Sequence, residues 1–436
     1  MCRGERGGPC VTEAQPGRGG VGGAVAKKPV VAALDIGTSK VLAAAAVPED
    51  AGLRVLGIAG VTCAGVRRGA VVDLTLAAAS LRGAMQRIRH MAGQPVPGVL
   101  LGSAGGQPIC LNAYAEVDVA APGGEIASAD VSGVLERAAH AELPAGYQLV
   151  HAIPQGYAVD GYEGCTDPVG MAGHRLAVKA HLVACQAAVL QNLLKAAEVA
   201  GVHAEDFAVS GLGAAEAVLT AEERREGAVL IDLGAGATQV VVVVAGEPAL
   251  TASVPVGGEH VTADIAAGLR LTRAQAEGLK LRHAGVDPQT VPADRRVVVE
   301  AAAGPAGDAG PDVAERELAE IGAARVEEIL QAVAGIVAQV GRGQRLGGGA
   351  VLTGGGSRLR GLQGVAMRVL GMPVRRGGAA GASGSLAAPE CAAVVGLVQM
   401  HAQRLTGGNG RLLPTSEPRR LWPPWRALAL RQAASR

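Results

Sequence analysis

The sequence predicts an α/β protein with two related lobes, because one hairpin pattern occurs twice at distant places in the chain. In residues 229–244 a β-branched run ends at Asp232, glycines follow, and a second β-branched run begins. Residues 30–46 repeat this order around Asp35, and residues 350–360 add a strand end that runs into three glycines and a helix. Glycine-rich turns can cradle phosphate through their backbone N–H groups. The pattern therefore predicts two lobes that face each other across a nucleotide.

The composition narrows the class of protein. A chain of 436 residues is long enough for about two to four domains with apolar cores. The net charge of +1 and the aromatic content of 2% lead us to expect no nucleic-acid partner. No apolar run reaches the roughly eighteen residues of a membrane span, and no secretory signal is present, so we expect a cytosolic protein. The seven cysteines are never spaced Cys-x-x-Cys, which favours buried thiols over zinc ligands or disulfides.

The first part of the chain divides by composition. Residues 1–29 are rich in Gly, Pro and Arg without apolar periodicity, which predicts a disordered tail. Residues 30–74 and 166–225 predict the first lobe. Between them, residues 75–165 predict a small α+β subdomain inserted into that lobe, because short strands there precede a helix near residues 130–142.

The second part of the chain predicts the other lobe, in residues 226–247 and 317–405. Residues 248–316 predict a subdomain of this lobe on the nucleotide side. A polar linker follows in residues 406–420, and residues 421–436 form a separate short segment.

The first hairpin turn has the residues of a phosphate loop. Gly37, Thr38 and Ser39 offer backbone amides and hydroxyls, Asp35 would hold Mg²⁺ through water, and Lys40 adds a positive charge. An ordinary hairpin turn would be the better interpretation if this motif stood alone. The ordered presence of three such strand ends reverses that preference.

The second turn and the triple glycine complete the predicted site. Asp232 would be the second carboxylate near the cation, and Gly234 and Gly236 let a ligand approach the backbone closely. Glu277 and Lys280 lie one helical turn apart, so both can point at a ribose or an adenine edge. A solvated ion pair is the alternative for these two residues.

The C-terminal segment has the composition of a helix that lies on a membrane surface. It holds both tryptophans of the chain together with leucines and arginines, and a polar linker tethers it. The candidate membrane residues are Trp422, Trp425, Arg426, Leu428, Leu430 and Arg431. A helix that docks on its own domain is the alternative.

The ordered loops are similar to those of the superfamily of actin, Hsp70 and the sugar kinases. Within it the chain resembles the bacterial cell-division family FtsA. The most specific similarity lies in Val150-His-Ala-Ile-Pro-Gln-Gly-Tyr-Ala-Val-Asp160, with residues 167–173 and 178–183. Gly65-Val-Arg-Arg-Gly69 and residues 276–283 are also similar to FtsA segments. The resemblance covers residues 30–403.

The resemblance implies an actin/Hsp70-like two-lobed α/β fold, with duplicated ribonuclease-H-like domains and a small α+β subdomain inserted in the first lobe. It implies ATP and Mg²⁺ as ligands, with Asp35 and Asp232 nearest the metal. The first phosphate loop would be residues 35–40, and Glu277 and Lys280 would contact ribose and base. The second loop would comprise Asp232, Gly234, Ala235, Gly236 and Thr238, and the adenosine turn Gly354, Gly355, Gly356 and Ser357.

The resemblance also implies a role in division. Such a protein polymerises and tethers the FtsZ ring, through the FtsZ C-terminal tail, to the cytoplasmic face of the inner membrane at the septum. It is a peripheral protein on an anionic membrane surface, and it recruits later division proteins.

Some residues depart from the family pattern. In the second loop Ala235 and Ala237 stand in place of Gly and Thr, and Gln239 stands where relatives often carry Asp. Gly211 and Leu212 stand where hydrolysing relatives tend to have a carboxylate. We therefore expect ATP hydrolysis to be slow at most. A phosphotransferase of the sugar-kinase type and a pilus-assembly actin-like protein are the alternatives.

Overall fold

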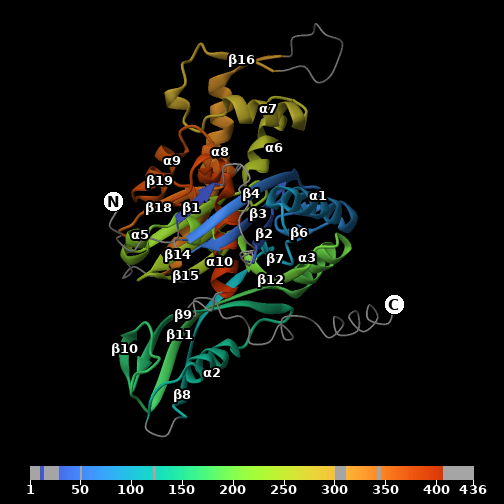
Figure 1. Cartoon of the computed structure of the whole chain (residues 1–436). Helices are drawn as coiled ribbons and strands as arrows, with labels where there is room; N and C mark the ends of the chain where they lie inside the picture. Colours follow the sequence, from blue (N-terminus) through green and yellow to red (C-terminus); the bar gives the residue numbers. More distant parts are fainter. Residues whose placement is uncertain are drawn as a thin grey trace, which may run out of the picture.

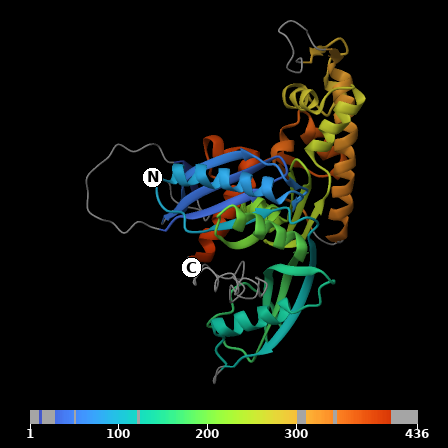
Figure 2. The same cartoon turned by 90° about the vertical axis from the view of Figure 1, so that its right-hand side faces the viewer.

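The computed structural model describes residues 10–13, 29–49, 52–120, 124–299, 311–340 and 345–405. Two lobes lie side by side in the middle of the molecule, with a small subdomain below them and a helical subdomain above (Figure 1). A view from the side shows the long helix of the upper subdomain running down along the second lobe (Figure 2).

A six-stranded sheet forms the first lobe, in the order β1-β4-β3-β2-β7-β12. Strands β2, β3 and β4 form an antiparallel meander, and β7 and β12 extend it in parallel. Helix α1 begins after Asp73, whose side chain accepts a hydrogen bond from the Leu76 N–H at 2.9 Å, and packs on β3 and β4 beside α3. The bounds are β2 Val31–Ile36, β3 Lys40–Glu49, β4 Gly52–Thr62, β7 Val99–Ser103, β12 Ala204–Val209, α1 Leu74–Ala92 and α3 Ala187–Val199.

The second lobe repeats this arrangement in a five-stranded sheet, in the order β15-β14-β13-β18-β19. Strands β13 to β15 form the antiparallel meander, and β18 and β19 extend it in parallel. Apart from the edge strand β1, which has no counterpart in the second lobe, the two sheets therefore correspond strand for strand, which confirms the predicted duplication. Long runs of Val, Leu and Ile suit β13 and β14, because almost every residue of these two strands is buried. The bounds are β13 Ala228–Leu233, β14 Thr238–Val244, β15 Glu247–Val254, β18 Ala350–Thr353 and β19 Val374–Arg376.

Two helices join the lobes. Helix α10, Ala392–Leu405, packs on strands of the first sheet, and helix α4, Ser210–Val218, packs on strands of the second. They cross at glycines, because a Cβ placed on Gly396 would lie 1.7 Å from the carbonyl oxygen of Gly213. Any larger side chain would force the helices apart.

The inserted subdomain is a four-stranded antiparallel sheet, in the order β10-β9-β11-β8, with α2 against one face. Its predicted bounds, residues 75–165, are wrong at both ends. Helix α1 and strand β7 belong to the first lobe, because β7 pairs in parallel with β2, and β11 belongs to the inserted sheet, because it pairs with β8 and β9 along its length. The bounds are β8 Ile109–Asp118, β9 Tyr147–Val159, β10 Tyr162–Cys165, β11 Arg175–Gln186 and α2 Ser128–Ala139.

The helical subdomain lies above the second lobe (Figure 1). It begins after β15 rather than at residue 248, because β15 pairs with β14 in the main sheet. Its long helix begins at Glu315, because the preceding residues, Asp312–Ala314, pair with Arg296–Val298 in a small hairpin. The bounds are α6 Gly258–Gly268, α7 Arg273–His283, β16 Arg296–Val298, β17 Asp312–Ala314 and α8 Glu315–Val337. Further short elements are β5 Val66–Arg67, β6 Ala70–Val71, α5 Ala221–Glu226 and α9 Leu362–Leu370.

The N-terminal tail, which was predicted to be disordered, contains a short strand. Strand β1, Cys10–Glu13, falls within the tail predicted as disordered and pairs in parallel with β4 at the edge of the first sheet. An edge strand leaves backbone groups unpaired, so a short N-terminal segment can satisfy them. The predicted membrane segment, residues 421–436, and its linker lie outside the described residues. Among the helices of the described ranges, none is long and apolar enough to span a membrane.

The inserted subdomain is also bonded to the second lobe. His181 on β11 is fully buried and lies 2.9 Å from Asn112 Oδ1 and from Thr251 Oγ1. Because Asn112 donates its side-chain N–H to the Ala249 carbonyl oxygen, its Oδ1 faces the imidazole and accepts from the Nδ1–H. The other ring nitrogen then accepts from the Thr251 hydroxyl, so the neutral imidazole satisfies both neighbours. Burial lowers the pKa of His181 to about 4.

We expect His181 to make the free energy of unfolding depend on pH. Its pKa is about 4 in the folded protein against an ordinary 6.5, so its stabilising contribution is complete above pH 6.5 and is lost as the pH falls toward 4. The loss is up to about 3 kcal/mol. Urea unfolding of His181→Gln should show a shallower fall in stability across this range, whereas exposed His90→Gln should retain the full fall. An unchanged fall in His181→Gln would contradict the buried, neutral imidazole.

Candidate functional site

The two predicted phosphate loops are equivalent turns in the structure. The Gly37 N–H donates to the Lys40 carbonyl at 3.1 Å, and the Gly234 N–H donates to the Ala237 carbonyl at 3.0 Å. A Cβ placed on either glycine would lie 2.9 Å from that same carbonyl oxygen. Both turns therefore need glycine at their first position. Both also follow directly after the end of a buried strand.

The loops face each other across a cavity of about 910 Å³. They come close at one point, since a Cβ placed on Gly236 would lie 2.4 Å from Thr38 Oγ1. The same hydroxyl oxygen accepts a hydrogen bond from the Arg68 N–H at 3.1 Å. Arg68 lies in the turn between β5 and β6, so three chain segments meet at Thr38.

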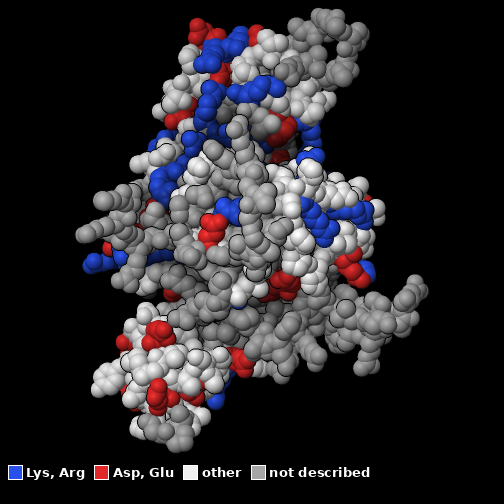
Figure 3. Space-filling view, in the orientation of Figure 1, with Lys and Arg blue, Asp and Glu red and all other residues white. Residues whose placement is uncertain are grey.

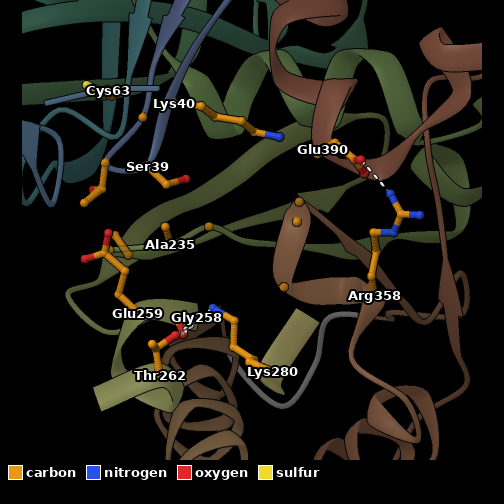
Figure 4. A pocket seen from close by; sticks show the side chains of 18 of the residues that line it. Ser39, Lys40, Cys63, Ala235, Gly258, Glu259, Thr262, Lys280, Arg358 and Glu390 are labelled. Atoms are coloured by element: carbon orange, nitrogen blue, oxygen red, sulfur yellow. Dashed lines mark hydrogen bonds and ion pairs between the residues drawn. The ribbon is translucent and has the colours of Figure 1, made fainter. Parts of the chain in front are cut away.

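The cavity brings together most of the predicted nucleotide residues (Figure 4). Thr238 and Ser357 do not line it. The Thr238 hydroxyl donates to the Val256 carbonyl at 2.8 Å and the Ser357 hydroxyl to the Gly354 carbonyl at 2.7 Å, so both side chains shape the loops from behind. The predicted residues that do line it are Asp35, Gly37, Thr38, Ser39, Lys40, Asp232, Gly234, Ala235, Gly236, Glu277, Lys280, Gly354, Gly355 and Gly356.

Asp232 is buried, Asp35 is partly buried, and the two aspartates are close enough to influence each other. Burial raises the pKa of Asp35, although a hydrogen bond from the Ser210 hydroxyl and the charge of Lys40 act against the rise. Burial also raises the pKa of Asp232 to about 7, and the negative charge of Asp35 adds to it while Lys40 opposes it. Two such carboxylates at one cavity repel each other unless a cation lies near them.

The donor set fits a hard divalent cation that brings further ligands with it. Among the described residues, neither Asp35 nor Asp232 forms an ion pair, so both carboxylates remain available to a cation. No group of three or more His, Cys, Asp or Glu side chains in the described ranges could hold a metal unaided. Mg²⁺ commonly takes only one or two carboxylates and completes its shell with water and phosphate oxygens. Asp35 and Asp232 could hold it in this way.

Glu277 and Lys280 form an ion pair of 2.7 Å. A solvated ion pair was the alternative prediction for these two residues, but the observed pair is not fully solvated. The Lys280 side chain is only 12% exposed, against 42% for Glu277. Lys280 Nζ also donates to the Gly258 carbonyl at 3.1 Å and to Thr262 Oγ1 at 2.8 Å (Figure 4). The lysine is therefore held at the cavity wall by three oxygen atoms, with its partner partly open to a ligand.

Several residues of the site were not predicted. Arg358 and Glu390 form an ion pair of 2.7 Å at one side of the cavity (Figure 4). Ser210 contacts Asp35, and Gln239, noted only as a departure from the family pattern, lines the cavity beside Asp232. The only signal for Ser210 was its position directly after a strand, at the start of a helix.

The duplicated sheets and the facing loops are those of the actin-like class. Solved structures of this fold include a PilM–PilN type IV pilus complex, with a TM-score of 0.57 and 17% identity over 85% of this chain and 98% of that one. MreB5 of Spiroplasma citri bound to ADP gives a TM-score of 0.50 and 15% identity over 88% of this chain and 99% of that one. Similarity at this level shows the shared fold.

Sequence comparison gives the family. The model of the cell division protein FtsA matches residues 229–396, and that of the SHS2 domain inserted in FtsA matches residues 105–184. FtsA of Pseudomonas aeruginosa is 33% identical over 350 residues, which cover 80% of this chain and 82% of that protein. FtsA of Bacillus subtilis is 33% identical over 78% of this chain and 77% of that protein. The chain belongs to the FtsA family of cell division proteins.

Gly354 gives a direct test of the loop geometry. Its φ is +79°, and a Cβ there would lie 2.2 Å from Asp232 Oδ1. Left-handed backbone costs a residue with a Cβ roughly 1–2 kcal/mol, and displacement of the carboxylate adds to this. Gly354→Ala should therefore lower the free energy of unfolding by at least that amount in urea titrations. Gly355→Ala is the matched control, because nothing lies within 4 Å of a Cβ at Gly355. Equal stability of the two variants would contradict the close approach of Gly354 to the Asp232 carboxylate.

Proposed function

We propose that this chain binds ATP with Mg²⁺ between its lobes and acts as the actin-like adaptor of the division ring. The observation that carries the proposal is the pair of equivalent glycine turns, each next to an aspartate that lines one cavity. The turns offer N–H groups to phosphates, and Asp35 and Asp232 offer negative charge to the cation. Lys280 and Glu277, with the Gly354 to Ser357 turn, supply the wall for ribose and base. A structure of the same fold, MreB5, was solved with ADP bound.

The division role rests on family membership. We infer that the chain polymerises, binds the C-terminal tail of FtsZ and holds the FtsZ ring at the cytoplasmic face of the inner membrane, where it recruits later division proteins. Hydrolysis should be slow, since Gly211 and Leu212 offer no carboxylate at the start of α4. Turnover in the ordinary enzyme range of roughly 1–10³ s⁻¹ would instead favour a phosphotransferase.

The charge distribution supports self-association. Lys and Arg gather on the upper part of the face in Figure 3, whereas the inserted subdomain at the bottom shows mainly Asp and Glu. Residues 345–376 contain six arginines and no Asp or Glu, and residues 105–186 contain nine Asp or Glu against three Lys or Arg. Opposite charge on two separate parts of one surface favours contact between successive copies rather than a closed pair.

The composition of residues 421–436 supports the membrane tether. Each arginine near an anionic surface contributes about 1 kcal/mol. Burial of one large apolar side chain contributes roughly 1.5–3 kcal/mol. Part of this is offset by ordering the helix, so a single tail should bind reversibly. Several tails in one filament should bind firmly, because the later contacts are intramolecular.

Replacement of Asp232 tests nucleotide binding. Asp232→Ala should weaken Mg²⁺·ATP binding in calorimetry, because it removes one of the two carboxylates at the cavity. Asp118→Ala is the control, since that side chain is 92% exposed on the inserted sheet. Absence of ATP binding by the unaltered protein would refute the site assignment, and equal affinity of Asp232→Ala would remove Asp232 from it.

Deletion of residues 421–436 tests the tether. The truncated protein should bind ATP normally but no longer float with anionic liposomes, and Trp425→Glu should act similarly by charging the inserted face. Raised salt should weaken binding without abolishing it, because only the arginine share is screened. If the truncated protein still floats, or if the second lobe unfolds, the segment is a packed part of its domain and not a tether.

A further inference from the structure

The first turn of α4 is linked by hydrogen bonds to both carboxylates of the site, directly to Asp35 and through Gln239 to Asp232. The hydroxyl of Ser210, the first residue of α4, donates a hydrogen bond to Asp35 Oδ1 at 2.5 Å. The N–H of the next residue, Gly211, donates to Gln239 Oε1 at 2.8 Å. The amide nitrogen of Gln239 in turn lies 3.5 Å from Asp232 Oδ2. Two short chains of contacts therefore start at adjacent residues of one helix and end on the two aspartates.

The orientation of Gln239 follows from its backbone partner. A backbone N–H can only donate, so the atom of Gln239 that faces Gly211 is the carbonyl oxygen, and the amide nitrogen is left to face Asp232. The side chain is 8% exposed, and Ser210 is 2% exposed. Gly211 makes room for this contact, since a Cβ there would lie 3.1 Å from both Cβ and Oε1 of Gln239. Burial and close packing therefore hold both donors in place.

The chemistry of the donors matters as much as their position. Asp35 and Asp232 repel each other, so each needs a partner that fixes its orientation before any cation binds. A lysine or arginine would fix a carboxylate but would also neutralise it and compete with a cation. The Ser210 hydroxyl and the Gln239 amide are neutral, so they orient the oxygens and leave the negative charge available. Helix α4 also packs on the second-lobe sheet and against α10, which ties both carboxylates to the contact between the lobes.

We propose that Ser210 and Gln239 are positioning residues, which hold Asp35 and Asp232 in the arrangement that accepts a divalent cation together with the phosphates of a nucleotide. This inference rests on the proposed function of the cavity. It assigns the cation preference of the site to two neutral side chains, Ser210 at the start of α4 and Gln239 on β14, neither of which is itself a predicted ligand. The carboxylates act on the cation, and Ser210 and Gln239 act through the carboxylates.

The test separates cation-dependent from cation-independent binding. Ser210→Ala and Gln239→Met remove the donors with little change in volume. Calorimetry of the full chain with ATP is carried out in Mg²⁺ and in EDTA, and Mg²⁺ is titrated into the ATP-loaded protein. Each variant should weaken Mg²⁺-dependent affinity by about threefold to tenfold, the range expected for one hydrogen bond, and should leave the affinity in EDTA unchanged.

Two control variants make the same chemical changes where no such bond exists. Ser253→Ala and Gln399→Met remove polar atoms at sites where Ser253 Oγ and Gln399 Oε1 are buried without a partner among the described residues. Both controls should keep the Mg²⁺ midpoint of the unaltered protein. Thermal unfolding without ligand should be similar for all four variants, which shows that the fold is intact.

Three results would count against the positioning role or against the proposed function on which it rests. A Mg²⁺ midpoint unchanged in both Ser210→Ala and Gln239→Met would overturn the inference. An equal loss of affinity with and without Mg²⁺ would also overturn it, because the two residues would then only support the loops. If the unaltered protein binds no ATP in either condition, the proposed function itself fails, and this is seen before any variant is compared.

Discussion

Two like charges at one cavity, one of them buried and the other partly buried, are the constraint on which this structure depends. Asp35 and Asp232 each end a central strand of one lobe, and the negative charge of Asp35 adds to the effect of burial in raising the pKa of Asp232 to about 7. The fold keeps them close through contacts that only small residues allow, such as Gly354 against Asp232 and Gly236 against Thr38. It orients them through neutral donors. A cation with an anionic ligand would balance the charge of such a site, and this requirement connects the duplicated lobes to the proposed nucleotide binding.

The same elements also join the parts of the molecule. The first turn of α4 contacts Asp35 directly and Asp232 through Gln239, and the helix crosses α10 at Gly213 and Gly396, so the site and the contact between the lobes share one helix. On the other side of the second sheet's meander, β15 accepts hydrogen bonds from the inserted subdomain, and β14 next to it begins in the second phosphate loop. The inserted subdomain is therefore bonded to both lobes, through the chain to the first and through His181 and its neighbours to the second.

The sequence predicted what is local. Each phosphate hairpin is encoded by one short stretch of consecutive residues, with an apolar strand, an aspartate and a glycine turn. The duplication, the loops and the family could therefore be predicted from the residues alone. The pairing of strands that lie far apart in the chain has no comparable local sequence pattern. Strand β7 and strand β11 have ordinary apolar patterns, and only their partners show that one belongs to the first lobe and the other to the inserted sheet. Ser210 and Asp35 are 175 residues apart, and no local pattern joins them. The membrane segment stays a prediction from composition.

The location of a bound cation tests the central claim most directly. Crystals of the full chain grown with Mn²⁺ and a non-hydrolysable ATP analogue would show the metal by its anomalous scattering. The account predicts one peak per chain, next to the side chains of Asp35 and Asp232, with the phosphates of the analogue over the two glycine turns. A peak away from both carboxylates, or an analogue that contacts neither turn, would contradict it.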